Sequence, residues 1–453
     1  MKRKSSIRRL PVALCVLLAG ALLAGCSAPP SPPGDESNPL REALETPPAP
    51  PPSEPDAVAA LGAEARGMWV LAEGSQRVLE DPERIRPLLE VAEELQVTDL
   101  FVQVYRGGRS WYPSQIADPT PYREAHPPEG FDVFDLLLTQ AHERGIRVHG
   151  WVNVLSLSAR KESKILDELG PDAILVDSRG RSLLDYPDME VPQPDRQFYR
   201  MGTRGLYLDA GAPGVAERLV ATFVELIETY PTLDGLHLDY IRHPGALPFI
   251  PGSRFGVGLD FGYGPASRKR FQEETGLAGP FRDPENPDPT RLVNQNAWDD
   301  WRRQKVTDLV REIGISTRAI SPALILSAAV NSYVDRAYLS LSQDWLRWLE
   351  DGYIDLALPM TYTLDDRLLR YQVEHFARSA HADQIWPGLG VWLFAKRPAG
   401  AVEQIEIAQR AGAPAIVLFS YDSIADAPEL LRTLAQATAK ETEDEAAPAH
   451  ARP

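Results

Sequence analysis

The chain has 453 residues, of which 43% are hydrophobic and 25% charged, a composition typical of a globular protein. Its formal net charge is −17, which repels a polyanion, so no nucleic-acid partner is expected. The length could hold roughly two or three average domains, but α/β barrels of this size also occur as one domain.

The first residues read as a targeting segment. A basic start, Lys2 to Arg9, precedes an apolar run over residues 11–24 that is too short to span a membrane. The run ends in Leu-Ala-Gly-Cys, which is similar to a bacterial lipobox, so we expect removal of residues 1–25 and lipidation of Cys26. Cys15 would leave with the signal, and no disulfide is expected. A plain signal peptide cut nearby is the alternative.

Residues 26–63 are rich in Pro, Ser, Glu and Ala and include PPAPPPSEP, which predicts an extended tether without a core. Ser27 after the lipid-bearing cysteine indicates, by analogy with enteric bacteria, the outer membrane facing the periplasm. The charged residues 439–453 are expected to be a disordered acidic tail. The folded part is therefore predicted at 64–438.

Within the folded part, short apolar runs rich in β-formers alternate with amphipathic stretches. The predicted strands are Arg66–Leu71, Asp99–Tyr105, Arg147–Val152, Asp234–Leu238, Ile325–Val330, Ile354–Pro359, Trp386–Trp392 and Ala415–Phe419. The predicted helices are Pro82–Leu95, Val133–Arg144, Val215–Thr229, Asp344–Glu350 and Ala401–Ala411. This order predicts a (β/α)8 TIM barrel. A doubly wound open sheet is the runner-up, but no GxGxxG follows the first strand.

Two connections are long for this fold, residues 155–209 after the third strand and 244–296 after the fourth. Long loops without a core of their own are usually functional or flexible. In a barrel, the loops at the carboxyl ends of the strands shape the active site. We therefore expect these inserted loops to border the site.

The most informative stretch is DGLHLDYIRHP at 234–244, where an apolar strand ends in a carboxylate, Asp239. Because buried charge is costly, such a residue more often serves a function, although an Asp that caps the next segment or pairs with Arg242 is the plain alternative. Period-two alternation places His237 and Asp239 on one face, toward the barrel axis.

The other strand ends carry amides, arginines, carboxylates and aromatic rings. Aromatic faces stack on sugar rings, and sugar hydroxyls need polar partners. Glycoside cleavage uses two carboxyl groups that flank the bond. A metal site is disfavoured, because HExxH and paired cysteines are absent and His149 and His237 are better explained as hydrogen-bonded barrel residues. A serine hydrolase is disfavoured because no GxSxG occurs. No cofactor is expected.

Several motifs in order resemble the bacterial glycosyl-hydrolase-like family ten. They are RGMWV at 66–70, FVQVYRGGRSWYPS at 101–114, GIRVHGWVNV at 145–154, DGLHLDYIRHP at 234–244, WDDWRRQKVTDLV at 298–310, QDWLRWLEDGYIDLALPMTY at 343–362 and IVLFSYDS at 416–423. The resemblance implies a TIM-barrel glycosidase, and family members include envelope lipoproteins that cut peptidoglycan glycan strands. It also implies that Asp239 is the acid of strand four.

Strand four is also similar to the nucleophile strand of the α-amylase superfamily, with His237 where that superfamily has Arg. Those enzymes take their general acid from a Glu at the end of strand five, but LILSAAVNSY at 324–333 contains no Glu. We therefore expect Asp239 to act as nucleophile or as base for water, with a second acid as proton donor. The candidates, in order of preference, are Glu73, Asp422 and Asp335. Substrate-assisted cleavage through an N-acetyl group is a variation that needs one strong acid.

The remaining strand-end residues are predicted to bind hydroxyls, orient Asp239 or stack on sugar rings. They are Gln103, Arg106, Trp111, Trp151, Asn153, His237, Tyr240, Arg242, Asn331, Tyr362, Trp392 and Tyr421. The expected partners are the glycan strands of peptidoglycan, with peptide-free strands among the substrates, and a membrane that the protein reaches through its lipid. The protein itself is expected to be a monomer. A non-catalytic glycan-binding lipoprotein and a glycosidase of another exported polysaccharide are the alternatives.

Overall fold

The computed structural model describes residues 65–125, 131–249 and 259–446, which all belong to one compact unit, Thr46–Pro453. The other unit, Met1–Glu45, lies outside the described residues, as do the predicted signal segment, Cys26 and the tether. None of the described helices is both long enough and apolar enough to cross a membrane.

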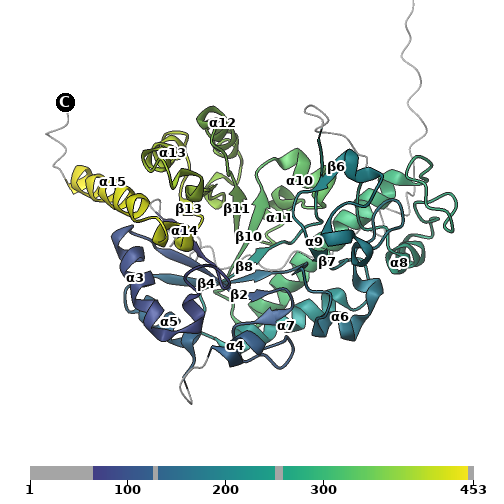
Figure 1. Ribbon diagram of the computed structural model, residues 1–453, viewed down its shortest axis with the longest axis horizontal. Coiled ribbons are helices and arrows are strands. Elements are labelled where there is room, and N and C mark those ends of the chain that lie inside the picture. Colours follow the sequence, from purple (N-terminus) through teal and green to yellow (C-terminus); the bar gives the residue numbers. More distant parts are fainter. Residues whose placement is uncertain (1–64, 126–130, 250–258, 447–453) are drawn as a thin grey trace, which may run out of the picture. The chain divides into compact units, whose positions relative to one another are not determined.

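The predicted TIM barrel is confirmed (Figure 1). Its eight parallel strands are β1 (Arg66–Val70), β2 (Asp99–Arg106), β4 (Arg147–Asn153), β8 (Gly235–Asp239), β10 (Ile325–Asn331), β11 (Leu356–Met360), β12 (Gly388–Leu389) and β13 (Ile416–Leu418). The ring closes because β1 pairs with β2 on one side and with β13 on the other. Each of the eight predicted strands overlaps one of these. A short strand, β3 (Arg109–Ser110), pairs with the end of β2 in the antiparallel direction.

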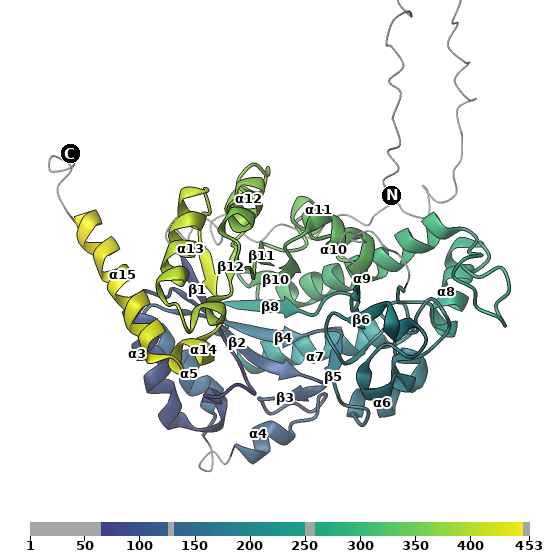
Figure 2. The same ribbon diagram turned by 45° about the horizontal axis from the view of Figure 1, so that its top comes forward.

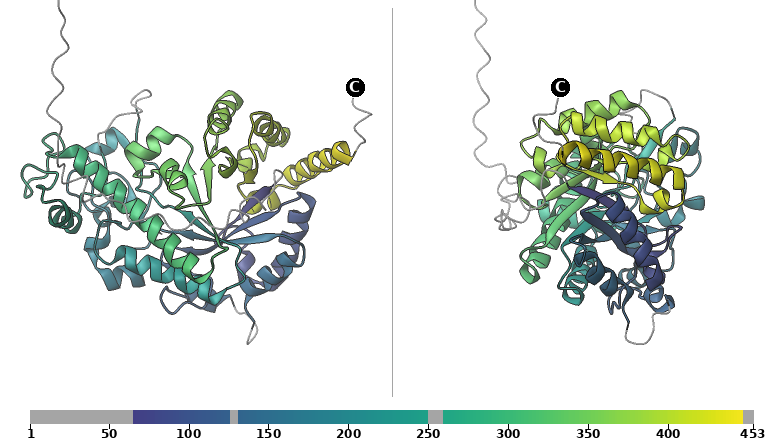
Figure 3. Two further views of the ribbon diagram at one scale, coloured as in Figure 1. Left: turned by 180° about the vertical axis from the view of Figure 1, so that it is seen from behind. Right: turned by 90° about the vertical axis from the view of Figure 1, so that its left-hand side faces the viewer.

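Helices follow the strands and cover the barrel from outside (Figure 3). They include α3 (Ile85–Glu94), α5 (Val133–His142), α7 (Val215–Thr229), α9 (Gln295–Ile320), α11 (Trp345–Glu350), α12 (Asp366–Phe376), α13 (Ala399–Arg410) and α15 (Pro428–Ala446). The five predicted helices are confirmed within a few residues. The tail was predicted to be disordered from residue 439, but α15 continues to Ala446, and residues 447–453 lie outside the described part.

The two connections predicted as long loops contain elements of their own. The first holds β5 (Ser156–Ser158), α6 (Lys164–Leu169), β6 (Tyr199–Met201) and β7 (Leu206–Tyr207), and the second holds β9 (Ala246–Pro248) and α8 (Pro265–Thr275). Strand β5 pairs with β7, and β6 pairs with β9, so the two connections are joined. A separate aromatic cluster includes Phe271, Trp298 and Trp301. Figure 2 shows these elements gathered beyond the carboxyl ends of β4 and β8.

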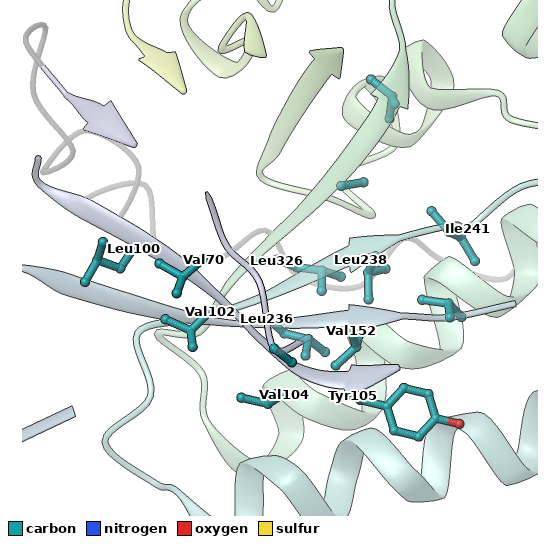
Figure 4. Packing of buried hydrophobic residues seen from close by; sticks show 14 of the residues in the cluster. Val70, Leu100, Val102, Val104, Tyr105, Val152, Leu236, Leu238, Ile241 and Leu326 are labelled. Atoms are coloured by element: carbon teal, nitrogen blue, oxygen red, sulfur yellow. The ribbon is translucent and has the colours of Figure 1, made fainter. Parts of the chain in front are cut away.

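The alternation of side chains along each strand divides the buried residues into two layers. Leu100, Val102, Leu236 and Leu238 belong to the large cluster between the strands and the helices (Figure 4). Residues at the intervening positions, among them Trp69, Phe101 and Trp151, form a second cluster inside the barrel. His237 contacts all three of these rings, so it points inward, and Asp239 follows two positions later on the same face.

At the amino-terminal end of the barrel interior, Asp99, Arg147 and His149 form a buried, hydrogen-bonded ionic group. The guanidinium of Arg147 donates to both oxygens of Asp99 at 2.7 Å, and His149 Nε2 lies 2.9 Å from Asp99 Oδ1. Burial alone would raise the pKa of Asp99, but hydrogen bonds from His149 and Arg147 outweigh it and lower that pKa to about 2. Position 235 must be glycine, because a Cβ there would lie 2.0 Å from His149 Nδ1. His149 is thus the hydrogen-bonded barrel residue that was predicted.

This lowered pKa links Asp99 to the pH dependence of stability. A carboxyl group with a folded-state pKa of about 2, below the ordinary 3.8, adds stability above the unfolded pKa that is lost as pH falls through the folded one. Asp99→Asn should therefore lower the free energy of unfolding at pH 7 by about 3 kcal/mol, because it leaves buried charge unpaired. The deficit should shrink by about 2 kcal/mol as pH falls toward 2. Urea unfolding across this pH range measures both.

Asp135→Asn is the matched control, since Asp135 is exposed in the first turn of α5. It should leave the unfolding curve at every pH within about 0.5 kcal/mol of the parent. If the loss of unfolding free energy in Asp99→Asn stayed constant down to pH 2, the lowered pKa of Asp99 would be contradicted.

Candidate active site

Asp239 ends β8 at the carboxyl mouth of the barrel. Its neighbours across the sheet are β10 and β4, and Asn153 of β4 is its register partner. Oδ1 accepts hydrogen bonds from the Tyr240 amide at 2.6 Å and from Arg242 Nη1 at 3.2 Å. Within the described ranges, no hydrogen bond is made to Oδ2. One oxygen is therefore held by two donors, while the other has no donor among the described residues.

The chain turns sharply directly after this aspartate. Tyr240 has a φ of 51°, in the left-handed region that non-glycine residues rarely adopt. The turn places the Arg242 guanidinium 4.7 Å from the centre of the Tyr240 ring, and that ring lies 6.1 Å from the ring of Tyr207. Burial alone lowers the pKa of Arg242, but Asp239 and the two tyrosines raise it above its ordinary value. Arg242 therefore stays charged and fixes one oxygen of Asp239.

Two amide side chains join the ends of β2 and β4 beside this carboxylate. Gln103 Nε2 donates to Asn153 Oδ1 at 3.2 Å, and Gln103 Oε1 accepts from the Ala72 amide at 3.4 Å. Gln103 and Asn153 are buried, which keeps their orientation fixed. The predicted residues Gln103 and Asn153 are thus brought together with Asp239.

Glu73, the preferred second acid, lies in the loop after β1 and forms ion pairs with two arginines. Arg106 Nε lies 3.3 Å from Glu73 Oε2, and Arg109 donates to Glu73 Oε1. The side chain of Glu73 is 35% exposed. Arg109 also lies over the Trp111 ring at 5.3 Å. Glu73 is therefore accessible, and two guanidinium groups hold its carboxylate in one place.

Asp422, the second candidate, is bound by the backbone of the same loop. It lies in the first turn of α14 (Tyr421–Ala425), where Oδ2 accepts from the Leu71 amide at 3.2 Å and Oδ1 from the Gln76 amide at 2.9 Å. Gly74 allows this approach, because a Cβ there would lie 1.9 Å from Asp422 Oδ1. Burial raises the pKa of Asp422. Both oxygens thus fasten the loop that carries Glu73.

The third candidate, Asp335, is exposed in the first turn of α10 (Val334–Leu341). Its Oδ1 accepts from the Arg336 amide, and its side chain lines a groove between α10 and α12 instead of the barrel axis. Asn331, at the end of β10, accepts from the Tyr333 amide at 3.0 Å. The structure therefore does not bring Asp335 together with the barrel-axis residues.

His237 was predicted to bind a hydroxyl or orient Asp239, but its ring is enclosed below the mouth. Trp69 Nε1 can only donate, and it does so to His237 Nε2 at 3.1 Å, so the proton is on Nδ1, which donates to Ser327 Oγ at 2.8 Å. Burial lowers the pKa of His237 well below its ordinary value. Its exposed fraction is 0%, which leaves no ring nitrogen for a sugar.

The three tryptophans predicted as stacking surfaces differ in exposure. Trp111 and Trp151 are each 3% exposed and pack inside the protein, whereas Trp392 is 46% exposed in the turn after β12. A Cβ at Gly390 would lie 3.2 Å from both Trp392 Nε1 and Tyr362 Cδ1, so both rings pack against this glycine. Among the three, Trp392 therefore offers the open aromatic face.

Two predicted tyrosines carry neutral hydroxyl groups. Burial and the charge of Asp239 raise the pKa of Tyr362 well above its ordinary value, so the phenol near Asp239 is a hydrogen-bond donor. Tyr421 is buried beside Asp422, and burial raises its pKa to about 12. Tyr207 was missed by the sequence analysis, although the alternation in LYLD at 206–209 could have indicated a short strand.

The described part of the chain holds no group of three or more His, Cys, Asp or Glu side chains that could bind a metal ion. The chemistry that the arrangement offers is that of carboxylates with fixed arginine, amide and phenol partners.

The different surroundings of Glu73 and Asp422 predict a loss of activity for one variant and a loss of stability for the other. Glu73→Gln should lower glycan cleavage by about 100-fold or more if Glu73 is the proton donor, with little change in unfolding free energy because the group is partly exposed. Asp422→Asn should lower the free energy of unfolding by about 1 to 3 kcal/mol, since its NH2 would face a backbone N–H. Urea unfolding and release of reducing ends separate the two. A stable, inactive Asp422→Asn beside an active Glu73→Gln would reverse the order of the candidates.

Comparison with known proteins agrees with this site. The family model described as Glycosyl hydrolase-like 10 matches residues 64–387. Glycosyl hydrolase DigH of Escherichia coli K12 is 24% identical over 394 residues, which cover 80% of this chain and 76% of the relative. A similar protein from strain O6:H1 is 24% identical over 381 residues, which cover 77% of this chain and 74% of that relative.

Solved structures share the fold at low identity. The PgaB (BpsB) glycoside hydrolase domain from Bordetella bronchiseptica aligns with a TM-score of 0.58 and 14% identity, covering 83% of this chain and 99% of that domain. The β-amylase catalytic domain from Paenibacillus polymyxa aligns with a TM-score of 0.51 and 11% identity, covering 84% of this chain and 99% of that domain. Because the family model spans most of the barrel, the chain belongs to the glycosyl hydrolase-like 10 family and is a glycosidase.

Proposed function

We propose that this glycosidase is anchored in the cell envelope and cleaves amino-sugar glycan strands, with peptidoglycan as the polymer and Asp239 as the central carboxylate. The observation that carries the proposal is the difference between the two carboxylate oxygens of Asp239. Tyr240 and Arg242 donate to Oδ1, whereas Oδ2 receives no hydrogen bond from any described residue. Family membership supports the reaction class. The lipobox at Cys26 and the proline-rich tether support the envelope address.

In the proposed reaction, the bond between the anomeric carbon and the bridging oxygen breaks, and water supplies OH to the carbon and H to the leaving sugar. Asp239 attacks the anomeric carbon or takes a proton from the attacking water. Glu73 is the preferred donor to the leaving oxygen, because it is the accessible acid of the mouth. Arg242 stabilises the charged carboxylate of Asp239 before it attacks or takes the proton, and again when the carboxylate is released. The distance between the two carboxyl groups in the complex decides between retention and inversion.

The substrate is bound, in this proposal, by groups at the same end of the barrel as Asp239. Trp392 stacks on a sugar ring, and Tyr362 donates to a hydroxyl or N-acetyl oxygen. The Gln103–Asn153 amide pair adds fixed polar groups on the strands beside Asp239. Such a set of aromatic and amide partners suits an amino sugar, which carries both a flat C–H face and an amide.

Asp239→Asn should keep the fold and lower glycan release by about 1,000-fold or more, because the amide neither attacks carbon nor takes a proton. New reducing ends from peptidoglycan strands, with and without peptide stems, are the measurement. Asp351→Asn is the matched control, since it removes an aspartate–arginine pair with Arg347 in another part of the fold. Full activity of Asp239→Asn would overturn the assignment, and binding by the parent without cleavage would favour a non-catalytic glycan binder.

The proposed location in the cell envelope is tested separately from the catalytic activity. Cys26→Ala should abolish incorporation of labelled fatty acid and keep residues 1–25 attached, because both the acylation and the cleavage of a lipobox depend on its cysteine. The activity of the purified protein on soluble strands should not change. Incorporation of labelled fatty acid into Cys26→Ala would contradict lipid anchoring at this residue.

A further inference from the structure

Three arginine side chains lie together where the loops after β2 and β5 meet. Arg106 and Arg109 are paired across the short hairpin that joins β2 to β3, and its turn contains Gly107. Arg160 follows β5 and packs against the same turn, because a Cβ at Gly107 would lie 3.4 Å from Arg160 Cδ. Figure 2 shows β3 and β5, which both contact β2, near the same end of that strand. We call Arg106, Arg109 and Arg160 the arginine cluster.

The arginine cluster carries more positive charge than its acidic neighbours offset. Glu73 forms ion pairs with Arg106 and Arg109, whereas the Arg160 guanidinium makes no hydrogen bond or ion pair with any described residue. Burial and the positive charges of Arg109 and Arg106 lower the pKa of Arg160, although Glu73 and Asp118 act in the opposite direction. Three guanidinium groups therefore lie near two carboxylates, and the positive charge of Arg160 is left without a paired anion.

The arginine cluster borders the mouth that holds Asp239. Burial and the charge of Asp239 raise the pKa of Tyr240, while the charges of Arg242 and Arg106 oppose this rise. Arg106 is therefore within electrostatic range of the residue directly after Asp239. Strand β5, which precedes Arg160, pairs with β7, and the Tyr207 ring of β7 lies 6.1 Å from the Tyr240 ring. A strand bound at Asp239 would thus pass close to the cluster.

The unmatched charge of the cluster indicates the ligand group that it would bind. A carboxylate carries one negative charge, and a guanidinium donates two parallel N–H groups to its two oxygens. The chain has a formal net charge of −17, so an anionic strand is attracted only where positive charge is concentrated. The side chain of Arg106 is 32% exposed, and Arg160 is also partly exposed, which leaves both accessible to a ligand. The cluster therefore fits an acidic group better than a neutral sugar.

We infer that the arginine cluster binds a carboxylate of the substrate strand, and that Arg160 makes this contact without breaking an existing ion pair. The choice of strand rests on the proposed function. Peptidoglycan offers a carboxylate in two places, on the lactyl group of a muramic acid unit without its peptide and on the peptide stem itself. In either case the cluster extends recognition from the sugar ring to an acidic substituent.

The test measures binding to the Asp239→Asn protein, so that the ligands are not consumed. Labelled strands of one length are prepared in three forms: without peptides, without peptides and with the lactyl carboxylates converted to neutral methylamides, and with the peptides retained. Fluorescence anisotropy gives the Kd of each form. If the lactyl group is recognised, peptide-free strands should bind about tenfold more tightly than their methylamides, and added NaCl should reduce this preference. If the stem is recognised, only strands with peptides should bind tightly.

Substitutions in the same background assign the preference to the cluster. Arg160→Gln should weaken binding of the preferred strands by about tenfold, leave binding of the methylamides unchanged, and keep the unfolding curve of the parent because no ion pair is lost. Arg160→Lys should keep most of the preference, since it retains the charge. Arg410→Gln is the matched control, because Arg410 lies in the last turn of α13, where it pairs with Glu406. It should bind all three forms as the parent does.

The outcomes separate this inference from the proposed function. Equal binding of all three forms, or an undiminished preference in Arg160→Gln, would overturn the role of the cluster, and cleavage of the strands by the protein with Asp239 intact would leave the proposed function standing. A preference that depends on Arg160, without cleavage by the protein with Asp239 intact, would overturn the proposed function and support the cluster as a carboxylate-binding site.

Discussion

The closure of the sheet by β1, which pairs with β2 on one side and with β13 on the other, is the constraint on which the site depends. It brings the loop after β1 beside the start of α14, where Asp422 accepts from the Leu71 and Gln76 amides. That clamp fixes the loop that carries Glu73. Without ring closure, residues almost 350 positions apart in the chain would not meet, and Glu73 would have no fixed position relative to Asp239.

The interior of the barrel is arranged in layers with different physical roles. At the amino-terminal end, the Asp99–Arg147–His149 group satisfies buried charge with short hydrogen bonds. Above it, aromatic rings surround a neutral His237. At the carboxyl end, the interior closes with a second set of polar side chains, Asp239, Arg242 and Tyr362. The layers below are closely packed and buried, so a substrate can reach only the residues at the mouth.

The two acids preferred for the reaction are both held by arginine, but with different consequences. Arg242 binds one oxygen of Asp239 from a buried position, and the left-handed turn at Tyr240 sets its direction. Glu73 is held by Arg106 and Arg109 at a partly exposed position. A buried pair holds the carboxylate in one orientation, as a nucleophile or base requires, while an exposed pair can exchange partners when a substrate arrives.

The order of strands and helices, the inward face of β8 and the position of Asp239 followed from the sequence, because the alternation of polar and apolar residues is local and repeats every two positions in a strand. The same pattern did not reveal that Trp151 is enclosed, and it left His237 open between a hydrogen-bonded barrel residue and a substrate-binding one, since strand-end position alone does not say how many layers lie above a residue. It also did not show that Asp422 binds the backbone of the loop after β1 while Glu73 pairs with arginines, or that Asp335 lies in an outer groove. Those assignments depend on contacts between distant segments, which only the tertiary structure decides, because the ring closure and the packing of the inserted elements determine which side chains meet.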